Sequence, residues 1–332
     1  MSSPESVKLT SSEMASLWDA YISNTHTACV LKHFVAVAED SDVLKLLSET
    51  LEVIQNAEQK TKKILESENI PIPIGFTDQD VDVNAPRLFT DTFSLLYIKN
   101  MARVMLAACS LMYSMSTRKD IRNHFKECIN RGTDIFDSVS DLLLAKGTYI
   151  RPPFIEPPKE VDFIENKDYV NGKNFFKDQR YLNAIEISHI FANIESNVVG
   201  NALTQAFGQT ADLKQIRDFM GDAGQLCTKV VNTLTEYLTG SKLPAPMGSD
   251  THVYSSPKPP FSDKLMAYEM SVLIATALSD YATSMAASMR NDLKSHYMDL
   301  LEDTLKIGKK AEDIMIEHAW LEQPPQQDKL TR

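Results

Sequence analysis

The sequence PIPIG at residues 71–75 separates two long helical patterns, and FTD follows it at residues 89–91. The same arrangement returns as PAPMG at residues 244–248, with FSD at residues 261–263. Proline removes a backbone donor, and glycine accepts the left-handed conformation in which many helices end. Each stretch therefore predicts the end of one helix and a connection to the next. Its recurrence predicts a tandem duplication.

A nearly constant spacing between the two halves supports this duplication. From Phe89 onward, the shift along the chain that carries Phe89 onto Phe261 aligns the halves without a gap. Before the Pro-rich stretches, a shift that is longer by a single position carries Glu13 onto Glu186. A register that holds across four helical patterns is the signature of an internal repeat.

Each half contains four helical patterns, in which apolar residues recur at three- and four-residue spacing. In the first half, helices are expected to begin near Ser11, after the polar run at 39–42, at Phe89 and near Ser116. We recognise no strict capping box at the first of these starts. We expect Ser116 or Thr117 to cap the fourth helix with its own side chain.

The fold class that follows is all-α, with two four-helix units that are most simply antiparallel bundles with a long connection between helices two and three. Residues 1–150 are expected to form the first bundle and residues 181–332 the second. Residues 151–180 contain four prolines, Pro152, Pro153, Pro157 and Pro158, so this segment is predicted to be a linker.

Composition excludes several classes of function. The net charge of -11 argues against a nucleic-acid partner, which needs a basic surface. The start of the chain has no secretory signal, and Lys99 and Arg103 interrupt the most apolar helix of the first half, so we expect no membrane span and a cytoplasmic location. The four cysteines lack C-x-x-C spacing and are expected to be reduced, buried, small hydrophobic residues: Cys29, Cys109, Cys128 and Cys227.

Longer motifs resemble a known family. The motifs that carry the resemblance are PIPIGF at 71–76, APRLFTD at 85–91, PFSDKLM at 260–266, SMRNDL at 288–293 and WLEQPP at 320–325. They are similar to those of domain-of-unknown-function family 3231, from bacilli and related spore-forming bacteria. The resemblance implies a ferritin-like bundle, duplicated here and related in fold to spore-coat proteins of the coat F type. It implies no activity, so no catalytic residue or cofactor is carried over.

A ferritin-like fold raises the question of a di-metal site, which needs Glu-x-x-His motifs on two helices. The sequence has one such motif, Glu186 with His189, at the start of a helix. Its counterpart, Glu13 with Ser16, lacks the histidine. We therefore favour a structural role for Glu13 and Glu186, in which each stabilises the start of a helix through the helix dipole.

A stronger metal candidate is a histidine with a carboxylate three residues later on the same helix face, because two such side chains can chelate one ion. The pairs are His124 with Glu127 and His296 with Asp299. An iron, manganese or zinc ion is the expected ligand. The competing interpretation is that each histidine bonds a neighbouring helix, and two ligands are few for a metal site.

The third helix of each half is rich in small residues, including Ala107 and Ala277. This composition permits close helix packing, or a cavity that carries a small apolar ligand. No phosphate-binding loop, dinucleotide fingerprint or nucleophile motif is present. The sequence therefore predicts a structural or interaction protein without catalysis, either cytoplasmic or spore-coat associated, with protein partners or self-association. Metal binding and ligand carriage are the alternatives.

Overall fold

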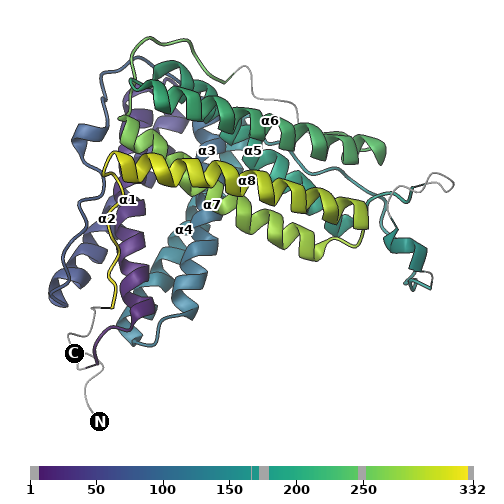
Figure 1. Ribbon diagram of the computed structural model, residues 1–332, viewed down its shortest axis with the longest axis horizontal. Helices are drawn as coiled ribbons and strands as arrows, with labels where there is room; N and C mark the ends of the chain where they lie inside the picture. The colour runs from purple at the N-terminus through teal and green to yellow at the C-terminus, as the bar shows by residue number, and fades with distance from the viewer. Residues whose placement is uncertain (1–6, 166, 172–178, 246–251, 328–332) are drawn as a thin grey trace. The chain divides into compact units, whose positions relative to one another are not determined.

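The computed structural model describes residues 7–165, 167–171, 179–245 and 252–327 (Figure 1). Those residues contain no β-strand, so the all-α prediction is confirmed. The expected turn at Gly248 and part of the predicted linker lie outside them. The α-helices are α1 (Ser11–Val37), α2 (Ser41–Ser67), α3 (Asp91–Ser114), α4 (Lys119–Ala145), α5 (Ala184–Thr210), α6 (Lys214–Gly240), α7 (Asp263–Ala287) and α8 (Asn291–Glu317), with short 3₁₀ helices at Asp78–Asp80 and Lys167–Val170.

The chain divides into two compact units. The first consists of residues 1–149, 256–266 and 315–332, and the second of residues 150–255 and 267–314. In the first unit α1 packs against α2 and α3 against α4, and in the second α5 packs against α6. Paired helices thus recur in the two tandem halves. The division into a first bundle at residues 1–150, a linker at 151–180 and a second bundle at 181–332 stays a prediction.

The start of α1 is held by a capping box that the sequence analysis did not recognise. Thr10 accepts a hydrogen bond from the Glu13 N–H, and the Glu13 carboxylate accepts one from the Thr10 N–H at 2.7 Å. The expectation that no strict box is present was wrong, because the cap is Thr10 rather than Ser11. The T-x-x-E spacing of residues 10–13 satisfies two helix-start donors reciprocally.

The same carboxylate also holds the start of α4. Glu13 Oε1 accepts hydrogen bonds from the backbone N–H groups of Thr117 and Arg118, at 2.8 and 2.7 Å. The expectation that Ser116 or Thr117 caps α4 locally was wrong, since the N-cap residue is Arg118 and no side-chain cap is present there. Burial alone would raise the pKa of Glu13, which is 0% exposed, but the hydrogen bonds from Arg118, Thr10 and Thr117 lower it to about 2.

The second unit repeats this arrangement at the position that the duplication predicts. Glu186 closes a capping box with Asn183 and accepts hydrogen bonds from the N–H groups of Met289 and Arg290, both at 3.0 Å. The Arg180 guanidinium also donates two hydrogen bonds to the Glu186 carboxylate, with N–O distances of 2.7 and 2.9 Å. Each copy therefore uses one buried carboxylate to join the start of its first helix to the start of its fourth.

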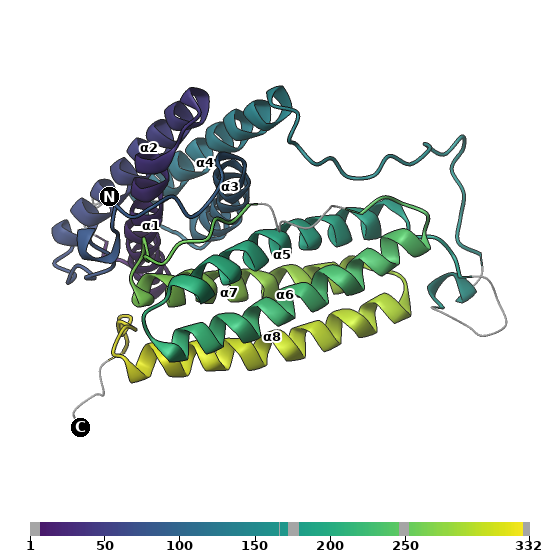
Figure 2. The same ribbon diagram turned by 90° about the horizontal axis from the view of Figure 1, so that it is seen from above.

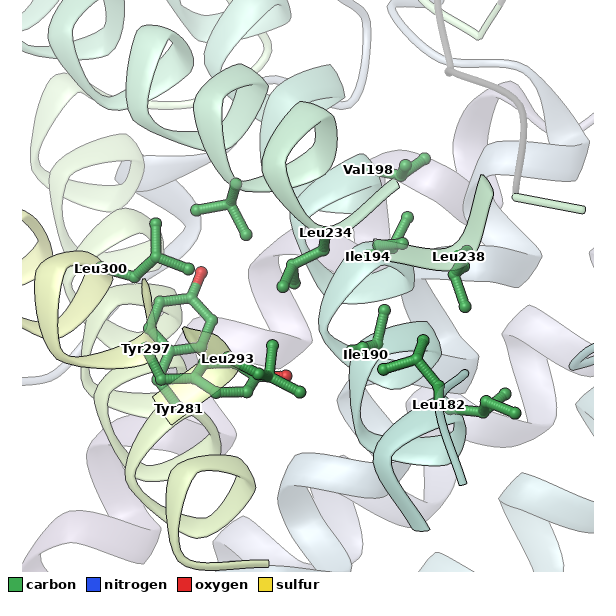
Figure 3. Packing of buried hydrophobic residues seen from close by; sticks show 12 residues of the cluster. Leu182, Ile190, Ile194, Val198, Leu234, Leu238, Tyr281, Leu293, Tyr297 and Leu300 are labelled. Atoms are coloured by element: carbon green, nitrogen blue, oxygen red, sulfur yellow. The ribbon is translucent and has the colours of Figure 1, made fainter. Parts of the chain in front are cut away.

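Figure 3 shows the core of the second unit, which gathers side chains from α5, α6, α7 and α8. Two asparagines of α5 lie inside this apolar cluster. The Asn197 amide donates to the Tyr281 hydroxyl at 2.8 Å, and the Asn193 amide donates to the Tyr297 hydroxyl at 3.2 Å. Because buried polar groups are costly unless paired, these bonds specify how α5 faces α7 and α8.

In the first unit, the PIPIG connection is bound by two residues from the second half of the sequence, Lys264 and Glu322. The Glu322 carboxylate accepts hydrogen bonds from the N–H groups of Ile74 and Gly75, at 2.8 and 2.7 Å. Lys264 Nζ donates to the Gly75 carbonyl at 2.6 Å. Gly75 has a φ of 60°, and a Cβ there would lie 2.4 Å from Thr25 Oγ1, so only glycine fits.

Among the described residues, one helix is long and apolar enough to cross a membrane by length and composition alone. It is α3, and 44% of its most apolar stretch is buried within the protein. Buried Lys99 lies within this helix, with its ammonium 4.2 Å from the centre of the Tyr149 ring. These features agree with the expectation that the chain has no membrane span.

Replacing Glu13 with glutamine should destabilise the protein by about 2–3 kcal/mol, because the amide cannot accept from all the donors that the buried carboxylate satisfies. The lowered pKa means that this contribution is present above the ordinary Glu pKa and is lost as the pH falls toward 2. Urea unfolding at pH 7 measures the effect. Glu66→Gln on the exposed face of α2 is the matched control and should change stability by less than about 0.5 kcal/mol.

His33 of α1 should make stability depend on pH. Its ring is 0% exposed and lies edge-on to Phe261, with centroids 5.3 Å apart. Burial lowers the pKa of His33 to about 4, so the unfolded chain takes up this proton first as the pH falls. Stability should therefore drop by about 3 kcal/mol between roughly pH 6.5 and 4. His33→Gln should flatten that part of the profile, and an unchanged slope would contradict the assignment.

Candidate functional site

A groove of about 520 Å³ lies between α2 and α4 in the first unit, and one residue of α3 also lines it. Its volume falls within the range of small-molecule sites. Most of the lining residues are polar or charged, but apolar atoms make up slightly more than half of the exposed lining. The residues that line it are Glu49, Glu52, Val53, Asn56, Ala57 and Lys60 of α2, Met105 of α3, and His124, Glu127, Cys128 and Arg131 of α4.

Two polar contacts join α2 to α4 at the groove. Lys60 Nζ forms an ion pair with Glu127 at 2.6 Å, between side chains that are about half-exposed. Beside the groove, the buried Thr61 Oγ1 of α2 lies 3.1 Å from Nε2 of the groove residue His124. The hydrogen bond from Lys60 lowers the pKa of Glu127, whereas burial lowers the pKa of His124. The groove therefore holds a carboxylate that stays charged and an imidazole that stays neutral near pH 7.

The predicted metal pair His124 and Glu127 thus lines one groove, but each side chain already has a protein partner. Within the described ranges, no group of three or more His, Cys, Asp or Glu side chains is arranged to hold a metal ion. An ion bound at Glu127 would have to share the carboxylate with the Lys60 ammonium. The metal site at this pair stays a prediction.

The metal candidates of the second half do not line the groove that His124 and Glu127 line. The exposed His296 Nδ1 is hydrogen-bonded to the Tyr237 hydroxyl, and Asp299 is exposed on α8. Glu186 is directed to the start of α8, as described above, whereas His189 Nδ1 lies 3.3 Å from Ser284 Oγ. Glu186 and His189 therefore contact different groups: Glu186 binds backbone N–H groups at the start of α8, and His189 lies beside Ser284 of α7.

The two alanines proposed to line an apolar cavity, Ala107 and Ala277, differ in how they are buried. Ala107 is exposed on α3, whereas Ala277 is packed against the core cluster of the second unit. Sequence reasoning missed the α2 side of the groove. The sequence pattern that could have revealed this side is a polar stripe along one face of α2. Its residues recur at three- and four-residue spacing: Glu49, Glu52, Asn56 and Lys60.

Elemental analysis of untagged protein, purified without chelators from medium that contains iron, manganese and zinc, tests the metal prediction. Thr61 already contacts His124 Nε2, and Lys60 already pairs with Glu127 Oε1. We therefore expect less than one equivalent of any of these metals per chain. His124→Gln is the control variant and should leave the metal content unchanged. A stoichiometric metal that this variant loses would establish the metal site instead.

Comparisons with known proteins agree with the repeated architecture. A family model described as "Protein of unknown function (DUF3231)" matches residues 2–161 and again residues 170–330. No curated protein matches the chain. A solved structure from Bacillus halodurans, described as a "putative spore coat protein", is similar over 47% of this chain and 100% of its own, with 21% identity and a TM-score of 0.42. The two consecutive matches to the family model cover almost all residues of this chain. The chain therefore belongs to the DUF3231 family and contains two copies of the family's domain.

Proposed function

We propose that the protein is a non-catalytic interaction protein that binds a protein partner through the connection at residues 150–165. Figure 2 shows this connection as an extended teal trace that leaves the end of α4. It belongs to no helix, yet it carries large apolar side chains. Phe154, Val161 and Phe163 are 78%, 87% and 80% exposed. This exposure is the observation that carries the proposal.

Exposed side chains of this kind favour binding. Burying one large apolar side chain stabilises a complex by about 1.5–3 kcal/mol, and neighbouring exposed apolar residues mark interaction sites. Ile155 and Ile164 are also exposed here. The four prolines at 152, 153, 157 and 158 restrict the backbone, which lowers the entropy that binding costs.

The charge of the segment indicates the chemistry of its partner. Glu156, Glu160, Asp162 and Glu165 outnumber Arg151 and Lys159. An apolar groove with a basic rim would complement this combination of aromatic, aliphatic and acidic groups. The repeat adds a further argument, because the shift that aligns the two halves carries Phe154 onto Gln326. The second copy thus lacks the apolar side chain, so the fold itself does not require it.

The polar groups that could perform chemistry support a non-catalytic function. Glu13 and Glu186 are used to hold helix starts, and His124 is buried against Thr61. We place the partner at the spore surface, since the family resemblance implies spore-forming bacteria.

A triple variant, Phe154→Ser with Val161→Ser and Phe163→Ser, tests the proposal. In a sporulating bacillus that expresses the full chain, we expect it to move from the spore-coat extract to the soluble fraction. The bound fraction should fall at least about tenfold, because each 1.4 kcal/mol lost changes binding tenfold. The melting temperature should not change, because these side chains support no core. Cell fractionation with immunoblotting and circular dichroism measure the two effects.

The matched control is Met298→Ser with Leu305→Ser, which removes exposed apolar side chains from α8. It should remain in the spore-coat extract. Equal distribution of the triple variant and the wild type would contradict the role of the segment. If the wild type stays in the soluble fraction, the spore location is contradicted. If a photo-crosslinker at residue 163 then links it to another protein, the interaction through this segment is still supported.

A further inference from the structure

Two cysteines that the chain separates meet where α3 packs against α4. Helix α3 packs along α4, and the register in which Gly132 of α4 faces Met105 and Leu106 of α3 brings Cys128 of α4 to Cys109 of α3, one turn farther along. Both side chains are largely buried, at 9% and 8% exposure, and both are free thiols. Neither residue belongs to a C-x-x-C motif, so only the antiparallel packing of the two helices brings them together.

The helix pair is closely packed beside this contact. One turn along α4, a Cβ placed on Gly132 would lie 3.1 Å from Leu106 Cδ2 and 3.7 Å from Met105 Cγ of α3. The register is consistent, because Met105 and Leu106 face Gly132 just as Cys109 faces Cys128. Helices this close bring facing residues toward the Cα separation of about 4.4–6.8 Å that a disulfide needs.

The pair is also within reach of small molecules. Cys128 lines the groove between α2 and α4, next to Lys60 and His124. The interaction between the two thiols lowers the pKa of Cys128, whereas that interaction and burial raise the pKa of Cys109. The first proton therefore leaves Cys128, which makes it the more nucleophilic of the two at neutral pH.

We propose that Cys109 and Cys128 are an oxidisable pair, which hydrogen peroxide entering the groove converts into a disulfide between α3 and α4. The Cys128 thiolate attacks one peroxide oxygen, the O–O bond breaks, and hydroxide leaves, so Cys128 becomes a sulfenic acid. The Cys109 sulfur then attacks the Cys128 sulfur, the S–O bond breaks, and water leaves. Two thiols lose two electrons and two protons, and one peroxide becomes two waters.

The other cysteines lack this setting. Cys29 donates to the Thr77 carbonyl at 3.3 Å, and burial raises its pKa to about 12. Burial likewise raises the pKa of Cys227 to about 12. In the second copy, the shift that carries Phe89 onto Phe261 places Tyr281 and Leu300 where the first copy has its cysteine pair. The pair is thus a property of one copy, and the repeated fold does not depend on it.

The test treats the reduced, full-length protein with hydrogen peroxide, blocks remaining thiols by alkylation under denaturing conditions, and maps the peptides by mass spectrometry. We expect a peptide that links Cys109 to Cys128 and the loss of two of the four thiols per chain. Cys29 and Cys227 should remain alkylatable. This wild-type measurement does not depend on whether a cysteine variant folds.

Two variants identify the order of the steps. In Cys109→Ser, Cys128 should accumulate a sulfenic acid that dimedone traps at least tenfold faster than at Cys29. In Cys128→Ser, Cys109 should stay reduced at the same peroxide dose. Cys227→Ser is the control and should form the disulfide as the wild type does. Disulfides shared among all four cysteines, or no thiol loss at a dose that oxidises free glutathione, would overturn the proposal.

Discussion

A buried carboxylate at the start of the first helix of each copy is the interaction on which the rest of the structure depends. Taking such a charge out of water is costly unless several donors replace the lost hydration. Glu13 meets this requirement with backbone donors from both its own helix start and that of α4. Because those donors belong to two helices, the carboxylate sets the position of α4 beside α1. The residues that α4 contributes to the groove are placed by the same constraint.

The two copies satisfy this constraint differently. In the first, the donors are mostly backbone N–H groups and the Thr10 and Thr117 hydroxyls. In the second, the Arg180 guanidinium adds a charge-assisted pair with Glu186. Duplication retained the carboxylate and allowed its surroundings to diverge. Features that keep the fold are therefore shared by the copies, and features that suit a function are more clearly seen where the copies differ.

Three such differences lie in or just after the first copy. The cysteine pair has Tyr281 and Leu300 as counterparts, and Phe154 has Gln326. The pairing of His124 with Thr61 is likewise unmatched, since His296 is exposed and bonds Tyr237. A second copy that preserves the architecture leaves the first copy free to vary, both on its surface and at buried positions such as Cys109 and Cys128. This explains why the cysteine pair and Phe154 have different counterparts in the second copy.

Local patterns in the sequence determined the helices, their duplication and the connections between them, because helical periodicity and the backbone limits of proline and glycine act within a few residues of chain. They placed His124 and Glu127 on one helix face, and that face does line the groove. The tertiary structure alone decided what those side chains contact, since Thr61 and Lys60 come from another helix. It also decided that Glu13 caps α4, that Cys109 meets Cys128, and that Phe154 and Phe163 stay exposed. Contacts between residues far apart in the chain depend on how helices pack, which no short pattern encodes.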